Sequence, residues 1–193
     1  MTGAHTVPTE PPATTQVALL RGINTGRSQR MTMGQLREVF AAVGLPAART
    51  FLQSGNVLFG AAPAEVDPLR ERLERAITER LGLTVAVVVR SAGALAETVA
   101  RSPLAGREAD PQRYLVAFCS HAPEPDRVRA VTPEGFLGVE YAVRGREIYL
   151  WCPAGVRMTA LTQDLWEKRL QLTATTRNWN TVRRLAALAA AHL

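Results

Sequence analysis

The stretch from Val17 to Phe59 most constrains what this chain can fold into. An uninterrupted apolar run, Val17–Leu20, ends in a polar, glycine-containing loop, and an amphipathic helix pattern follows. Two further apolar runs then flank Ser54-Gly55-Asn56, a sequence that supplies the positive φ a tight hairpin needs. The stretch therefore predicts strand, loop, helix, strand, tight turn and strand.

The signals that follow extend this order into a known pattern. In the first helix, Thr32 and Gln35 have the spacing of a capping box, and Gly44 is suited to end that helix. A second helix opens at 63–67 and stops at Gly82, and the β-branched segment Thr84–Val89 predicts a fourth strand. The resulting order is βαββαβ, the ferredoxin-like pattern.

A similar order begins again at Tyr114. A strand, a short helix, a hairpin around Arg144-Gly145-Arg146 and a helix over 159–170 precede a last helix at about 180–192. We therefore predict an α+β fold of two ferredoxin-like (βαββαβ-type) subdomains packed together, with antiparallel or mixed sheets and helices on one face. The expected divisions are a disordered tail at 1–15, an N-terminal subdomain at 16–102 and a C-terminal subdomain at 112–193.

Composition bounds the cellular setting and the chemistry. No segment approaches the ~20 apolar residues of a membrane span, and the first residues lack the basic and apolar regions of a signal peptide. Cys119 and Cys152 are too few for a disulfide framework or a zinc motif, and the three histidines have no ligand spacing. We expect a cytoplasmic protein with no metal, no cofactor and no membrane partner, whose cysteines are small buried side chains.

The net charge of +6 and the pI of about 10.3 invite a nucleic-acid interpretation. However, Lys168 is the only lysine, and the arginines are scattered along the chain. A GC-rich coding sequence gives such an arginine- and alanine-rich bias without any function. The central strands also lack the aromatic side chains on which ferredoxin-like sheets stack bases. RNA or DNA binding is therefore the alternative to a small-ligand function.

Three segments resemble one family of bacterial proteins: LLRGINTG at 19–26, TFLQSGNVLF at 50–59 and TTRNWNTVRRL at 175–185. Their combination and spacing are similar to the signature segments of the domain of unknown function 1697 family, DUF1697, over roughly Val17 to Leu188. The resemblance implies a two-subdomain α+β fold and no established activity, substrate or cofactor. The family often has a lysine where this chain has Ala160, which implies a difference in binding if that lysine contacts a ligand.

The loop after the first strand is the leading candidate for chemistry. Arg21, Asn24, Arg27 and Ser28 follow a strand and precede a helix, which is where ligands favour binding in open α/β sheets. Helix amino ends attract anions, and arginine adds a bidentate fork. The spacing of the glycines fails the test for a nucleotide phosphate loop. The alternative is structural: Asn24 and Gly26 shape the turn, and Arg21 pairs with a carboxylate.

Two other polar segments have a structural and a functional interpretation. Gln53, Ser54 and Asn56 belong to a hairpin turn, or Gln53 and Ser54 point into a cleft beside Arg21.

The second of these polar segments precedes the last helix. There Asn178 or Asn180 is a candidate N-cap, and Trp179 is either a core anchor or a stacking platform, with Arg177 as an anion-binding group.

Our hypothesis is that these three segments converge on one polar cleft between the subdomains. That cleft would bind a small anionic ligand, either a nucleotide or a phosphate-like group; no reaction and no oligomeric state is assigned. Nucleic-acid binding and a structural or partner-binding module without catalysis are the alternatives. The hypothesis requires the Arg21 guanidinium and the Trp179 indole to face the same hollow.

Overall fold

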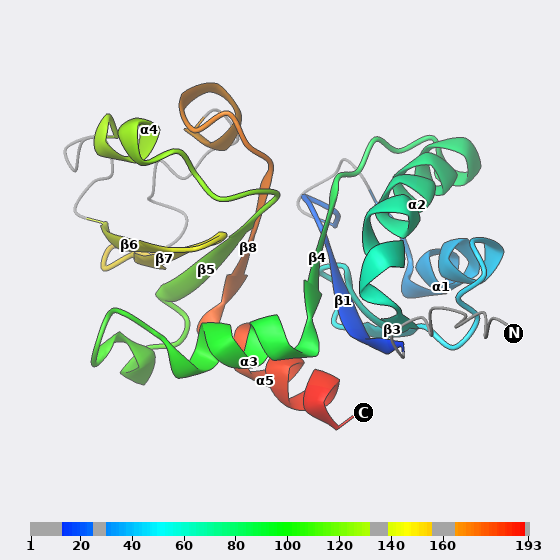
Figure 1. Ribbon diagram of the computed structural model, residues 1–193, viewed down its shortest axis with the longest axis horizontal. Helices are drawn as coiled ribbons and strands as arrows, with labels where there is room; N and C mark the ends of the chain where they lie inside the picture. Colours follow the sequence, from blue (N-terminus) through cyan, green and yellow to red (C-terminus); the bar gives the residue numbers. More distant parts are fainter. Residues whose placement is uncertain (1–12, 25–29, 132–138, 156–164, 192–193) are drawn as a thin grey trace, which may run out of the picture.

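Each half of the chain builds a four-stranded antiparallel sheet, and the two sheets face each other (Figure 1). The computed structural model describes residues 13–24, 30–131, 139–155 and 165–191. The N-terminal half contains β1 (Thr14–Leu20), α1 (Met33–Ala42), β2 (Arg49–Phe51), β3 (Asn56–Ala61), a 3-10 turn at Pro63–Glu65, α2 (Val66–Leu81) and β4 (Val87–Ser91). Helix α3 (Ala92–Ala100) and a 3-10 turn at Arg107–Ala109 lead to the C-terminal half.

The C-terminal half repeats this arrangement. It contains β5 (Tyr114–Cys119), α4 (Pro125–Arg129), β6 (Glu140–Arg144), β7 (Glu147–Trp151), a π-helical turn at Leu165–Arg169, β8 (Ala174–Asn178) and α5 (Trp179–Ala190). The strand orders are β2-β3-β1-β4 and β6-β7-β5-β8, so the first strand of each half lies between the third and the fourth. The predicted α+β fold of two ferredoxin-like units is confirmed, and all strand pairs are antiparallel.

The helix boundaries follow the signals in the sequence. Thr32 forms the predicted capping box: its Oγ1 accepts the Gln35 amide at 3.1 Å, and Gln35 Oε1 accepts the Thr32 amide at 2.9 Å. Gly44 and Gly82 have φ of 92° and 66°, the left-handed conformation that ends a helix. Ser91 Oγ accepts the Ala94 amide and so begins α3.

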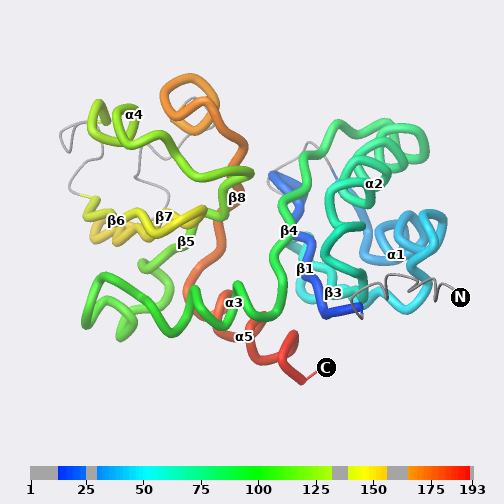
Figure 2. Tube along the Cα trace, in the orientation of Figure 1, coloured from blue at the N-terminus to red at the C-terminus, as the bar shows by residue number. Residues whose placement is uncertain are grey.

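Alternation along the central strands divides the interior into three apolar layers. Ala18 and Leu20 face α1 and α2, whereas Val17 and Leu19 point to the other side and meet the C-terminal half. This central core also takes Val116 and Phe118 of β5, and helices α3 and α5 close it along one side (Figure 2). A third layer lies between the far face of the second sheet and α4. Both faces of each sheet are therefore buried.

Strand β8 is not among the predicted elements, because no strand pattern stands between the helix expected at 159–170 and the last helix. Its inward-facing residues are Thr175 and Arg177, so the alternation of apolar side chains that indicates a strand is absent.

Several predicted boundaries also differ from those of the structure. Strand β1 begins at Thr14 rather than Val17, and β4 begins at Val87 rather than Thr84. Most of the tail expected at 1–15 and the first half of the helix expected at 159–170 lie outside the described residues. Among the residues that the structure describes, no helix is long and apolar enough to span a membrane.

Candidate functional site

The loop after β1 is held by Asn24, which has the left-handed φ of 57°. Its Nδ2 donates to Met31 O at 2.9 Å and to Gln53 O at 2.8 Å, and its Oδ1 accepts the Met31 amide at 2.9 Å. Asn24 thus ties the loop to the β2–β3 turn, as the structural interpretation requires. Arg27 and Ser28 lie outside the described residues.

The β2–β3 turn packs tightly against the end of β1. Gly55 has φ of 74°, and a Cβ at this position would lie 2.7 Å from Ile23 Cδ1 and 2.8 Å from Leu20 Cβ. The Gln53 and Ser54 side chains are exposed, whereas Asn56 is fully buried. Asn56 Nδ2 donates to Phe51 O at 2.8 Å and to Ser54 Oγ at 3.0 Å, which fixes its Oδ1 toward the C-terminal half.

Arg177 of β8 is the partner of that oxygen. Its guanidinium, in a residue only 7 % exposed, donates from Nε to Asn56 Oδ1 at 2.6 Å and from Nη2 to Leu20 O at 2.9 Å. Nη2 also reaches Ser54 O and Gly55 O, and Nη1 reaches Thr175 Oγ1 and Thr176 O. These contacts between Arg177 and residues 20 and 54–56 are called the Arg177 joint below.

The Arg177 joint contains a charge whose acceptors are all neutral oxygen atoms. Burial lowers the pKa of Arg177 to about 10, so the guanidinium remains charged at neutral pH. All its nitrogen atoms already donate to the protein. The 53–56 turn thus contacts both Asn24 and Arg177, and Arg177 uses its donors to hold the two halves together.

Asn178 and Trp179 begin α5. Asn178 Oδ1 accepts the Thr181 amide at 2.9 Å and is the N-cap of this helix. The Trp179 ring is 2 % exposed and lies 4.8 Å from the Tyr114 ring in the central core. A buried indole offers no open face to a base, so these contacts fit the core-anchor interpretation of Trp179.

Among the predicted residues that the structure describes, Arg21 is the one with a buried donor that has no partner. Its Nη1 pairs with Glu167 of the C-terminal half, which matches the expected carboxylate partner. Its Nη2 is buried and, among the side-chain atoms that the structure describes, is the only buried nitrogen or oxygen without a hydrogen-bond partner. A buried donor without an acceptor is costly and marks a position where an anion would be favoured.

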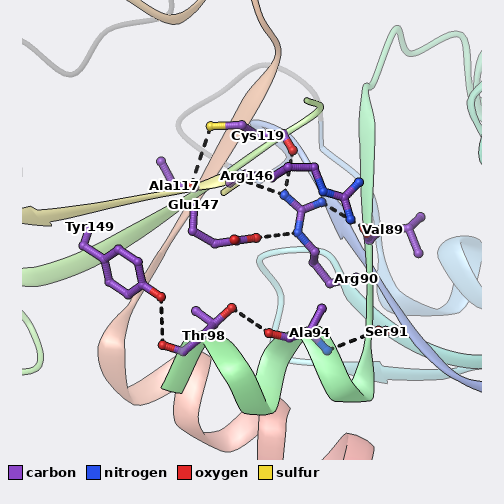
Figure 3. Close-up of polar contacts among 10 residues, drawn as sticks. All are labelled: Val89, Arg90, Ser91, Ala94, Thr98, Ala117, Cys119, Arg146, Glu147 and Tyr149. Atoms are coloured by element: carbon purple, nitrogen blue, oxygen red, sulfur yellow. Dashed lines mark hydrogen bonds and ion pairs between the residues drawn. The ribbon is translucent and has the colours of Figure 1, made fainter. Parts of the chain in front are cut away.

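A second arginine that the sequence analysis missed joins the halves in the opposite direction. Arg90 of β4 donates from Nε to Glu147 Oε1 at 2.6 Å and from Nη2 to Cys119 O at 2.6 Å and Arg146 O at 3.1 Å (Figure 3). Burial lowers the pKa of Arg90, and Glu147 counteracts this shift. The available signal was a single charge inside the β-branched run 87–91, because a charge buried in a strand needs a partner.

An open cleft of about 760 Å³ follows the outer edge of β4, and it is called the β4 cleft below. One wall is α2, and the other comes from the C-terminal half. The lining residues are 14, 16, 63, 66, 67, 70, 74, 86–93, 120, 146 and 173. The Arg146 side chain reaches toward β4 beside the Arg90 guanidinium (Figure 3), and its charge contributes to the lowered pKa of Arg90.

The two cysteines are buried thiols, as expected, and do not line this cleft. Burial raises the pKa of Cys119 to about 12 and that of Cys152 to about 11. Both thiols are therefore protonated at neutral pH and are poor nucleophiles. Among the described residues, no group of three or more histidines, cysteines and carboxylates could hold a metal ion.

The molecule thus consists of two ferredoxin-like halves joined by two buried arginines. Arg90 reaches from the N-terminal half into the C-terminal half, and Arg177 reaches the other way. A family model described as "Protein of unknown function (DUF1697)" matches residues 13–149, so the chain belongs to that family. The match includes the RGIN and QSGN segments but ends before Arg177. The resemblance inferred from the motifs is confirmed.

The fold is similar to that of the conserved bacterial protein SP0830 from Streptococcus pneumoniae. The TM-score is 0.68 at 21 % sequence identity, and the alignment covers 92 % of this chain and 99 % of the other. At this identity the likeness shows the fold alone. No curated protein matches the chain.

Proposed function

We propose that this protein binds a small ligand with a negatively charged group in the β4 cleft between its two halves. The observation that carries the proposal is the cleft itself, which both halves line and whose volume is about 760 Å³. Ligand pockets typically measure about 300–1,000 Å³ and favour such junctions. No reaction is assigned to it, and the described residues of its lining include neither a histidine nor a cysteine.

The charges in the β4 cleft support an anionic ligand. Arg70 is paired with Glu74 at 3.2 Å, and Arg90 is paired with Glu147 at 2.6 Å. Arg146 is exposed and forms no ion pair with any carboxylate in the described parts of the chain. Its guanidinium is therefore the group available to a ligand, and arginine binds carboxylates and phosphates through a planar pair of donors.

Arg21 remains a second candidate anchor. Its Nη2 is buried without an acceptor, and its amide donates to Ala86 O, beside the β4 cleft. An anion that reached Nη2 would satisfy this donor and would compete with Glu167 for the guanidinium. Arg21 and Arg146 can be tested separately, because they belong to different halves of the chain.

The alternatives receive less support from the geometry. A ferredoxin-like sheet binds RNA through an exposed face on which aromatic rings stack with bases. Here both faces of each sheet carry buried side chains. A cytoplasmic location is part of the proposal, and the two unpaired thiols are compatible with a reducing compartment.

A thermal-shift screen at constant ionic strength tests the proposal. The probes are inorganic phosphate, ATP and citrate, and the proteins are wild type, Arg146→Ala, Arg21→Ala and the control Arg184→Ala, which changes an exposed arginine of α5. A ligand at 100 times its Kd adds about 2.7 kcal/mol, which raises Tm by roughly 5–10 °C in a chain of this size.

We expect at least one probe to stabilise wild type and Arg184→Ala equally, and Arg146→Ala much less. A response lost in Arg21→Ala and kept in Arg146→Ala would move the site to Arg21. If all four proteins respond alike, or none responds, the proposal is wrong. Nucleic-acid binding would instead give an affinity that falls steeply as salt rises.

A further inference from the structure

We propose that the natural occupant of the β4 cleft is an extended acidic peptide that adds to the edge of β4 as a parallel strand. This inference rests on the proposed function and specifies its ligand class. Three features of the cleft support it: the hydrogen-bonding groups that β4 leaves open, the shape of the cleft and the position of Arg146.

Strand β4 is at the edge of its sheet, because β1 is its only neighbour among the strands that the structure describes. The Arg21 amide donates to Ala86 O at 2.9 Å, and Leu19 faces Val88 in the register. Hydrogen-bonded pairs alternate along an antiparallel ladder, so Ala86 and Val88 use their backbone groups toward β1. The amide and carbonyl groups of Val87 and Val89 therefore point outward, into the cleft.

Side chains of the protein already satisfy half of this open edge. The Val87 amide donates to Glu74 Oε1 at 2.8 Å, and Val89 O accepts from Arg90 Nη1 at 3.0 Å. Within the described residues, Val87 O and the Val89 amide have no partner. The backbone groups of β4 that remain free are thus one acceptor, Val87 O, and one donor, the Val89 amide, and they are called the free set below.

That set selects the direction of an added strand. In a parallel pair, a residue facing Val88 donates its amide to Val87 O and accepts the Val89 amide at its own carbonyl. It satisfies both free groups and leaves Glu74 and Arg90 in place. An antiparallel strand would need both groups of Val87 or both groups of Val89, and would have to displace one of these side chains.

A second copy of this chain is the less suitable occupant for the same reason. Two identical edge strands related by a two-fold axis pair antiparallel, which the free set does not favour. A nucleotide is also less suitable, because the described residues that line the cleft include no aromatic side chain to stack with a base. The cleft instead follows consecutive residues 86–93, a shape that suits an extended chain.

Charge selects the kind of peptide. Arg146 lies across from Val89, next to Arg90, and only Arg90 has a carboxylate partner there (Figure 3). An aspartate or glutamate side chain near the residue that pairs with Val88 would be close to the Arg146 guanidinium, which has no carboxylate partner among the described residues. A basic peptide would meet this positive charge and be repelled.

The test uses three synthetic peptides with the whole protein. The first is the acetylated, amidated peptide EVEVEVE, the second replaces each glutamate with lysine, and the third is the first with its backbone nitrogen atoms methylated. Affinities are measured by calorimetry at fixed ionic strength for wild type, Arg146→Ala and the control Arg184→Ala. Methylation removes the amide donors of the peptide and leaves the protein unchanged.

We expect the acidic peptide to bind wild type and Arg184→Ala, with at least tenfold weaker binding to Arg146→Ala. The methylated and basic peptides should also bind at least tenfold more weakly than the acidic one. Equal affinity for the methylated peptide would overturn strand addition. Phosphate binding that depends on Arg146, together with no peptide binding, would overturn this inference and leave the proposed function intact.

Discussion

Replacing Arg177 with alanine should destabilise the protein by breaking the joint between its halves. The substitution removes the only donor that the structure gives Asn56 Oδ1 and Ser54 O. Leu20 O keeps the Thr175 hydroxyl, and Gly55 O keeps the Leu20 amide. Each of the two acceptors left without a donor should lower the unfolding free energy by about 1–3 kcal/mol. Because the variant no longer buries a charge, we expect a loss of about 2–4 kcal/mol of unfolding free energy.

A double-mutant cycle isolates the central contact of the joint. Urea unfolding of Arg177→Ala, Asn56→Ala and the double variant should give a coupling of about 1.5–3 kcal/mol, the range for hydrogen bonds to charged groups. Arg184→Ala, which changes an exposed arginine, should stay within about 0.5 kcal/mol of wild type. A coupling below about 0.5 kcal/mol would refute the assignment of Arg177 to the joint.

Three further predictions concern the same interior. Gly55→Ala should cost about 1–3 kcal/mol more than Gly82→Ala, because both have positive φ but only the Cβ at Gly55 meets other side chains; equal costs by urea unfolding would refute this. Glu147→Ala leaves a buried guanidinium without its counter-charge and should cost about 3–5 kcal/mol. The exposed pair of Glu97 provides the control, since Glu97→Ala should cost under about 1 kcal/mol, and a similar loss in both variants would contradict the burial argument. Burial raises the pKa of Cys119 from 9.0 to about 12, so the thiol's contribution to the free energy of unfolding is complete below pH 9 and is lost as the pH rises through 12. Between pH 8 and pH 10 the unfolding free energy of Cys119→Ala should therefore fall less than that of wild type. Equal slopes of unfolding free energy against pH in the two proteins would refute this prediction.

Local signals predicted most of the fold because they act within a few residues. The capping box at Thr32 and the left-handed glycines at 44 and 82 give the helix ends directly. Strand β8 could not be predicted in this way, since its inner face is Thr175 and Arg177 rather than an apolar stripe. That face is polar because its partners are backbone oxygen atoms of β1 and the β2–β3 turn, more than 100 residues away in the chain.

The candidate site shows a similar division. Polar residues concentrated in three segments predicted one shared polar cleft, and this stays a prediction. The structure shows that Arg177 contacts the end of β1 and the β2–β3 turn. What the pattern could not reveal is that Arg177 would find enough neutral acceptors to use all its donors. The β4 cleft was missed because its free groups belong to the backbone of Val87 and Val89, and backbone groups leave no mark on residue identity.

The most direct test of our account is an amide chemical-shift titration of the protein with the acidic peptide EVEVEVE. We predict that the largest perturbations fall on residues 86–93 and on Arg146, with Val89 shifted most because its free amide gains an acceptor. Perturbations confined to residues 21–24, 53–56 and 177–179, with β4 unchanged, would contradict the account and locate the ligand at the Arg177 joint.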